Sequence, residues 1–192
     1  REKYGEWGII LGATEGVGKA FCERLAKEGM NVVMVGRREE KLKELGEELK
    51  NTYEIDYKVV KADFSLPDAT DKIFAATENL DMGFMAYVAC LHSFGKIQDT
   101  PWEKHEAMIN VNVVTFMKCF YHYMKIFAAQ DRGAVINVSS MTGISSSPWN
   151  GQYGAGKAFI LKMTEAVACE TEKTNVDVEV ITLGTTLTPS LL

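Results

Sequence analysis

Short, almost wholly apolar segments alternate along the chain with longer segments in which apolar residues recur every three or four positions. The short segments predict buried strands, and the longer ones predict amphipathic helices. The expected strands cover residues 7–11, 31–35, 57–62, 83–89, 134–138 and 176–183. The expected helices cover residues 17–28, 38–50, 67–78, 102–109, 111–129 and 152–172. Because the strands are apolar on both faces, the pattern predicts an α/β fold, a doubly wound parallel sheet of the Rossmann type with helices on both faces.

The composition is that of one globular domain spanning residues 1–192. Of these residues 46% are apolar and 24% are charged, which is enough to form a core without disulfides or a structural metal. The net charge of −5 and the lack of a basic stripe argue against nucleic-acid binding. The most apolar segment, 111–129, contains Lys118, His122 and Lys125, so we expect no transmembrane segment.

The four cysteines and three histidines are scattered and form no CxxC, Cys/His or HExxH spacing. This distribution predicts free thiols in a reducing compartment and argues against a metal site. We therefore expect a cytoplasmic protein, associated with a membrane only if a longer parent chain carries an anchor.

A glycine-rich turn follows the first expected strand, with Gly12, Gly16 and Gly18 in the spacing GxxxGxG. Between a strand and a helix, such glycines permit a tight bend, close approach of a pyrophosphate and close packing of the helix. The helix N-terminus then offers free N–H groups to the phosphates, so the turn predicts a dinucleotide site. The further cofactor contacts expected from this turn are Thr14, Glu15 and Val17.

Gly18 and Lys19 also resemble the end of the loop that binds nucleoside triphosphates, GxxxxGK[ST]. Ala13 stands where that motif needs its first glycine, and Ala20 stands where it needs the hydroxyl that binds magnesium. We therefore exclude a nucleoside-triphosphate loop.

The end of the second expected strand indicates which dinucleotide binds. NAD-binding folds usually place a carboxylate there for the ribose 2′-hydroxyl. This chain has Gly36 followed by Arg37 and Arg38, and two guanidiniums suit a 2′-phosphate. NADP is therefore favoured over NAD, although Glu15 in the same pocket argues the other way. Asp63, after the third strand, is expected either to contact the adenine or to serve as a turn or cap residue.

Tyr153 and Lys157 are four residues apart on the helix after the fifth strand, and thus share one helical face. A nearby cation favours the phenolate, so Tyr153 can exchange a proton with a carbonyl or alcohol oxygen near neutral pH. Both side chains are also expected to contact the cofactor, Lys157 through the nicotinamide ribose. Ser140, at the preceding strand end, is placed to bond the same oxygen, with ordinary strand-end capping as the alternative. Of two other Tyr-x-x-x-Lys pairs, the one at 57/61 lies on an expected strand, which holds its two groups too far apart. The one at 121/125 lies within a helix, with no strand end immediately before it.

In combination these motifs resemble the short-chain dehydrogenase/reductase family, in the branch with the glycine motif TGxxxGxG, over essentially the whole chain. The resemblance implies an NADP-dependent oxidoreductase in which Tyr153 is the acid/base, Lys157 tunes it and Ser140 holds the substrate oxygen. Asn112 matches the family's asparagine that kinks a helix and holds a water for the proton relay.

The end of the chain resembles the family's PGxxxT stretch at residues 183–188. This implies further cofactor contacts from Gly184, Thr186 and Thr188. Residues 3–7 and 37–42 look more narrowly like the 3-oxoacyl-CoA reductase and 17β-hydroxysteroid dehydrogenase branch.

The chain departs from the family's pattern at several positions. The family's NNAG after the fourth strand is replaced by Tyr-Val-Ala-Cys at 87–90, which leaves the affinity for the cofactor open. Leu11 replaces the leading threonine of the glycine motif, Leu183 replaces the proline, and Gly156 replaces a common serine. We expect the family's last strand and most of its substrate lid to be missing from residues 1–192.

The function predicted from this resemblance is hydride transfer between a nicotinamide and a ketone or secondary alcohol of steroid or 3-oxoacyl type. Trp149 and the loop 145–148 are expected to line the substrate site, which suits a bulky or lipidic ketone. The alternative is a catalytically weak dinucleotide-binding or redox-sensing protein on the same fold, and an epimerase or dehydratase is a third hypothesis. The resemblance also implies a homodimer or homotetramer, paired through residues 116–128 and 159–171.

Overall fold

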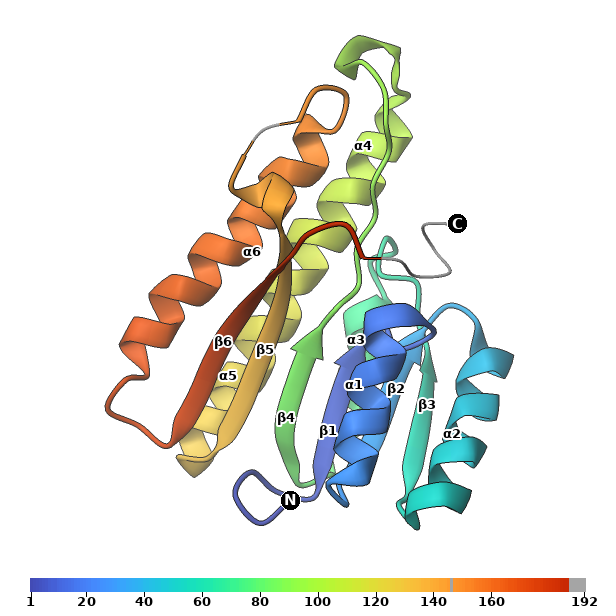
Figure 1. The fold of residues 1–192 in the computed structure, drawn as a ribbon, viewed down its shortest axis with the longest axis vertical. Coiled ribbons are helices and arrows are strands. Elements are labelled where there is room, and N and C mark those ends of the chain that lie inside the picture. The colour runs from blue at the N-terminus through green and yellow to red at the C-terminus, as the bar shows by residue number, and fades with distance from the viewer. Residues whose placement is uncertain (146, 187–192) are drawn as a thin grey trace.

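The computed structural model describes residues 1–145 and 147–186 (Figure 1). Within this part of the chain, six parallel strands form one sheet in the order β3-β2-β1-β4-β5-β6. The strands are β1 (Trp7–Leu11), β2 (Asn31–Gly36), β3 (Tyr57–Lys61), β4 (Met82–Tyr87), β5 (Gly133–Ser140) and β6 (Val176–Leu183). The chain reverses its direction of winding between β3 and β4, which is the doubly wound arrangement, so the predicted fold class is confirmed.

Helices cover both faces of the sheet (Figure 1). α1 (Gly16–Lys27) and α2 (Glu39–Tyr53) pack on one face. The helices associated with the other face are α3 (Ala69–Thr77), α4 (Trp102–Ile109), α5 (Phe116–Gln130) and α6 (Gly151–Glu170). The shorter helical turns are η1 (Ile97–Asp99), the π-helical η2 (Asn110–Thr115) and η3 (Met141–Gly143). Across the described residues, none of these helices is long and apolar enough to cross a membrane.

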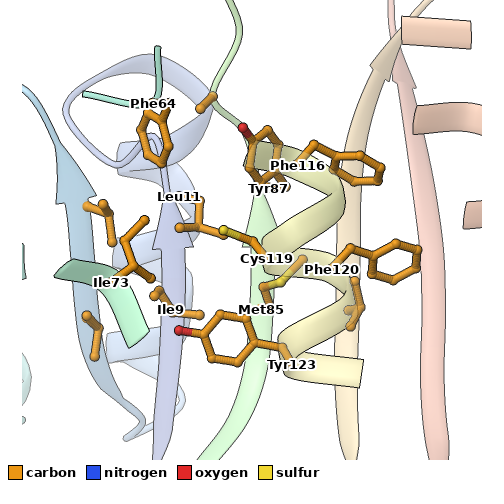
Figure 2. Packing of buried hydrophobic residues seen from close by; sticks show 14 of the residues in the cluster. Ile9, Leu11, Phe64, Ile73, Met85, Tyr87, Phe116, Cys119, Phe120 and Tyr123 are labelled. Atoms are coloured by element: carbon orange, nitrogen blue, oxygen red, sulfur yellow. The ribbon is translucent and has the colours of Figure 1, made fainter. Parts of the chain in front are cut away.

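Two apolar layers hold the sheet in place, because successive side chains of a strand point to opposite faces. Ile9 and Leu11 enter the layer under α5, where Phe116 and Phe120 pack against it (Figure 2). Ile10 enters the layer under α1 and α2. Fully burying one such side chain stabilises the fold by roughly 1.5–3 kcal/mol. The layers therefore fix the strand ends that carry the candidate site.

The long helical segment after β4 differs from the prediction. Separate helices were expected at 102–109 and 111–129, but α4, η2 and α5 run continuously. The buried Tyr87 hydroxyl donates to the Val111 carbonyl at 2.6 Å. This bond thus reaches into the π-helical turn η2 and ties it to the end of β4. The other predicted elements agree with the structure to within three residues at each end.

Candidate active site

The loops that follow the strands enclose a cleft of about 750 Å³ at the carboxyl edge of the sheet. This is the position where doubly wound sheets bind ligands. The predicted residues that line it are Gly12, Thr14, Glu15, Gly16, Val17, Arg37, Arg38, Asp63, Ser140, Tyr153, Lys157, Gly184 and Thr186. Gly18 and Asn112 are not part of this lining, and Thr188 lies outside the described residues.

The glycine turn has the shape that its spacing predicts. Gly12 adopts φ +101°, and a Cβ there would lie 2.6 Å from the backbone nitrogen of Ala89. At Gly18 a Cβ would lie 1.9 Å from the Gly12 carbonyl oxygen, so glycine is needed for α1 to pack this closely on the turn. Gly18 is therefore a packing residue behind the cleft, whereas Gly12 and Gly16 line it.

The N-terminus of α1 faces the cleft without a side-chain cap. Glu15, the residue before the helix, makes no capping hydrogen bond, and the first turn of α1 contains no acidic residue. The Glu15 carboxylate instead binds the Arg38 guanidinium, with Oε2 2.7 Å from Nη2. The first-turn N–H groups therefore stay available for an anion, which the helix dipole also favours.

The end of β2 presents two arginines to the cleft, Arg37 and Arg38. A Cβ at Gly36 would lie 2.6 Å from the Thr14 hydroxyl oxygen, so a side chain there would have to displace that hydroxyl. Close packing on the glycine turn thus accounts for the missing carboxylate at this position.

Asp63 serves as a turn residue, which was one of the two roles expected for it. Its carboxylate accepts hydrogen bonds from the Ser65 backbone nitrogen at 3.0 Å and from the Ser65 hydroxyl at 2.7 Å. Because Asp63 also lines the cleft, a contact with the adenine stays a prediction.

The three predicted catalytic side chains converge on the cleft from β5 and α6. Ser140 is the last residue of β5, and Tyr153 lies in the first turn of α6. The Lys157 ammonium lies 5.8 Å from the centre of the Tyr153 ring and donates to the Val138 carbonyl at 2.7 Å. A second bond, from the Ser139 hydroxyl to the Lys157 carbonyl at 2.8 Å, fixes α6 against the strand end.

Burial, rather than the nearby lysine, dominates the acidity of the phenol. Desolvation raises the pKa of Tyr153 to about 12, the Cys90 thiol adds to this increase, and a hydrogen bond with Ser140 opposes it. Burial also lowers the pKa of Lys157, whose side chain is only 1% exposed. The expectation that Lys157 draws the phenol toward the phenolate stays a prediction, because burial dominates the pKa of Tyr153 in the protein alone. The ammonium is directed at a backbone carbonyl, and the phenol is desolvated.

The loop after β4 is held without the family's NNAG sequence. The backbone nitrogens of Val88 and Ala89 both donate to the Leu11 carbonyl at 2.8 Å. Farther along the loop, the Asn112 side-chain amide makes two hydrogen bonds with the backbone of Leu91. Its oxygen accepts from the Leu91 nitrogen at 3.0 Å, and its nitrogen donates to the Leu91 carbonyl at 2.7 Å. Asn112 thus fixes this loop from the π-helical turn, so its observed contacts are those of a positioning residue rather than of a cleft-lining one.

Gly156, another departure from the family pattern, is explained by packing. A Cβ at this position would lie 2.8 Å from the Asn112 Cβ. The glycine lets α6 approach η2 at the level of the candidate catalytic residues.

Some residues that line the cleft were not predicted from the sequence. His92 lies edge-on to Tyr153, with ring centres 5.9 Å apart, and Phe94 and Met141 line the cleft while their side chains remain largely exposed. Trp149 and the described residues of the loop 145–148 do not line it, contrary to expectation, and residue 146 lies outside the description. The missed signal was positional, because His92 and Phe94 lie in the loop after β4, and the carboxyl end of that strand was expected at the site.

Comparison with known proteins identifies two close relatives. The 7beta-hydroxysteroid dehydrogenase of Collinsella aerofaciens is 84% identical over 192 residues, which is 100% of this chain and 73% of that protein. The 7beta-hydroxysteroid dehydrogenase of Clostridium sardiniense is 46% identical, over 100% of this chain and 74% of that protein. A very-long-chain 3-oxoacyl-CoA reductase of Rattus norvegicus is 31% identical over 82% of this chain and 52% of that protein, in line with the narrower resemblance.

Solved structures with a similar fold include proteins of the same kind. A structure of a 7beta-hydroxysteroid dehydrogenase superposes with a TM-score of 0.98 at 84% identity, covering 100% of this chain and 74% of that one. L-sorbose reductase from Gluconobacter frateurii, complexed with NADPH and L-sorbose, superposes with a TM-score of 0.88 at 25% identity, covering 98% and 72%. The family model for short chain dehydrogenases matches residues 6–191. The chain, with its doubly wound sheet and glycine-lined cleft, therefore belongs to the short chain dehydrogenase family of oxidoreductases.

Proposed function

We propose that the protein is an NADP-dependent hydroxysteroid dehydrogenase that interconverts a 7β-hydroxysteroid and the corresponding 7-oxosteroid. The observation that carries this proposal is the convergence of Ser140 and Tyr153 on a cleft continuous with the glycine turn. The choice of substrate is supported by the 84% identity to the Collinsella aerofaciens enzyme over the whole chain.

The cleft fits a nicotinamide dinucleotide. A Cβ at Gly12 would strike the Ala89 backbone, and the uncapped N-terminus of α1 suits a pyrophosphate. The residues proposed to hold the cofactor are Gly12, Thr14, Glu15, Gly16, Val17, Arg37, Arg38, Asp63, Tyr153, Lys157, Gly184 and Thr186, with Thr188 from outside the described residues. When bound, the nicotinamide ring supplies or accepts the hydride.

The preference for NADP over NAD rests on charge at the end of β2. Arg37 and Arg38 present guanidiniums where a carboxylate would select a free 2′-hydroxyl, and Gly36 leaves no room for that carboxylate without displacing Thr14. The NADPH complex of the related L-sorbose reductase supports the same choice. Glu15 neutralises part of this charge through its pair with Arg38.

Tyr153 acts as the acid when the ketone is reduced. Because burial raises the pKa of Tyr153 to about 12, the phenol carries its proton at neutral pH and can donate it to the substrate oxygen. The Ser140 hydroxyl hydrogen-bonds the same oxygen and stabilises the charge that develops there. The buried Lys157 ammonium, 5.8 Å from the ring centre, then favours the phenolate that remains.

The mouth of the cleft suits a bulky apolar substrate. Phe94 is 70% exposed and Met141 is 52% exposed, and both line the cleft beside Ser140 and Tyr153. Exposed apolar side chains in a cleft favour ligands that bury them. A steroid ring system offers such a surface.

The alternative of a catalytically weak dinucleotide-binding protein loses its main support. That hypothesis rested on the missing NNAG sequence, but Asn112 and the Leu11 carbonyl already hold the loop. An intact set of Ser140, Tyr153 and Lys157 in the cleft favours catalysis.

We also propose a homodimer or homotetramer that pairs through α5 and α6. Partly buried Met117, Met124, Phe159 and Met163 and the exposed Tyr121 give these helices apolar surface for a second copy. A cytoplasmic location is supported by the free thiols of Cys22, Cys90, Cys119 and Cys169.

The test is NADPH consumption, followed by absorbance, with a 7-oxosteroid and separately with a 3-oxoacyl-CoA. We expect turnover with the steroid, formation of the 7β-alcohol by chromatography, and a loss of at least about a hundredfold in kcat for Tyr153→Phe. NADPH affinity of that variant should change little. Turnover that survives Tyr153→Phe, or a steroid that is never consumed, would refute the proposal.

A further inference from the structure

The first turn of α6 is tied to α4 by the side chain of His105. Nδ1 of His105 bonds the Gln152 side-chain oxygen, and Nε2 lies 3.1 Å from the Ile97 carbonyl. The Gln152 amide nitrogen in turn donates to the His105 carbonyl at 2.7 Å. These contacts join α4 and η1 to the first turn of α6. In Figure 1, α4 and the start of α6 lie beyond the carboxyl ends of the strands, whereas the rest of α6 runs alongside β5 and β6.

The direction of these hydrogen bonds follows from the donors and acceptors present. The Gln152 amide nitrogen faces a carbonyl, which can only accept, so its oxygen is the atom that faces Nδ1. Nδ1 of His105 must therefore carry hydrogen and donate. The Ile97 carbonyl is also an acceptor, so Nε2 donates to it only when both ring nitrogens carry hydrogen.

The His105–Gln152 contacts, termed the Gln152 lock, lie in the same first turn of α6 as Tyr153, whose phenol the proposed mechanism uses. Gln152 precedes Tyr153, and Gly156, three residues later, packs on Asn112 of the continuous α4–η2–α5 segment. α6 is thus anchored to that segment on both sides of Tyr153. A further backbone bond, from the nitrogen of Gly95 to the carbonyl of Trp149 at 2.9 Å, ties the loop after β4 to the segment before α6.

Trp149 supports the view that this region is held in a defined conformation. Its backbone φ is +60°, a left-handed value that bulky residues rarely adopt. Such a conformation persists where surrounding contacts determine it, and here the Gly95 bond and the Gln152 lock flank it.

We propose that His105 is a positioning residue for the reaction. By donating from Nδ1 to Gln152, it fixes the first turn of α6 and thereby the Tyr153 phenol relative to Ser140. This inference rests on the proposed function, in which Tyr153 is the acid. Because small misplacements of reacting groups cost up to about a hundredfold in rate, we expect loss of this bond to lower kcat about tenfold.

Two substitutions test the contacts of the His105 ring with Gln152 and with Ile97 one at a time. His105→Asn places an amide nitrogen near the position of Nδ1, so it retains the Gln152 bond and loses the Ile97 bond. His105→Gln places the amide nitrogen near the position of Nε2, so it retains the Ile97 bond and loses the Gln152 bond. The positioning role predicts kcat within about twofold of the parent for His105→Asn, and about tenfold lower for His105→Gln.

The measurements are kcat and KM for a 7-oxosteroid, the Kd for NADPH and the thermal midpoint. The Kd for NADPH should change little, because neither His105 nor Gln152 is among the residues that line the cleft. His122→Gln, on α5 where the ring stacks on Phe74, is the matched control and should keep the parent kcat. Gln152→Leu removes the acceptor for Nδ1 and should match His105→Gln, and combining the two substitutions should lower kcat no further.

The outcomes distinguish the inference from the function on which it rests. Equal losses of kcat in His105→Asn and His105→Gln that follow the thermal midpoint would reduce His105 to a structural residue. Parent-like kcat in His105→Gln, with turnover abolished in Tyr153→Phe, would overturn the positioning role alone. Turnover retained in Tyr153→Phe would overturn the proposed function instead.

Discussion

The pair formed by Glu15 and Arg38 gives a sharp test of how the cleft selects its cofactor. Arg38→Ala removes one guanidinium that faces the cleft and leaves the Glu15 carboxylate, which is 24% exposed, without its partner at 2.7 Å. A hydrogen bond between charged groups contributes about 1.5–3 kcal/mol. We therefore expect NADPH affinity to fall about 10- to 100-fold, with a small change in NADH affinity.

The unpaired carboxylate should account for part of that loss. Like charges on the rim of a solvated cleft repel by roughly 1 kcal/mol, which is about fivefold in affinity. Glu15→Gln in the Arg38→Ala background should therefore recover about fivefold of the NADPH affinity and leave NADH unchanged. Protein stability should change by less than about 1 kcal/mol, because the pair is partly exposed.

Isothermal calorimetry with NADPH and with NADH measures both effects, and Arg24→Ala, on the outer side of α1, is the matched control. Arg24 pairs with Glu28 at the far end of that helix, so its removal should alter neither affinity. A fall of equal size for NADPH and NADH in Arg38→Ala would refute the reasoning, because the 2′-phosphate would then not be the group that Arg38 recognises.

Two further predictions concern stability. Tyr87→Phe removes the 2.6 Å bond to the Val111 carbonyl and should lower the free energy of unfolding by about 1–3 kcal/mol in urea, because the buried carbonyl loses this partner. An unchanged midpoint would show that the bond does not stabilise the fold. Burial opposes ionisation of Asp81, but its hydrogen bonds with Arg132 and the chain nitrogen of Glu6 lower its pKa overall. A lowered carboxyl pKa adds stability above the unfolded value near 4 that is lost as pH falls through the folded value. Asp81→Asn should therefore flatten the acid loss of stability between about pH 5 and 3 by less than about 1 kcal/mol, and urea titrations that coincide with the parent would exclude that contribution.

The sequence by itself determined the features that depend on neighbouring residues. Alternation of apolar strands with amphipathic helices is local, so it predicted the order of elements and the doubly wound sheet. Glycine spacing predicted the turn that Gly12 makes at φ +101°, and the four-residue spacing placed Tyr153 and Lys157 on one helical face. Strand ends of a parallel sheet share one edge, so residues after different strands were expected to meet.

Tertiary structure alone decided the contacts between distant segments. His105 and Gln152 are 47 positions apart, and Leu91 and Asn112 are 21 apart, so no local pattern marks either pair. The raised pKa of Tyr153 also followed from the packed structure, because desolvation depends on everything that surrounds the phenol and outweighed the hydrogen bond with Ser140. Spacing along a chain tells which groups share a face, whereas burial and long-range hydrogen bonds decide what those groups can do.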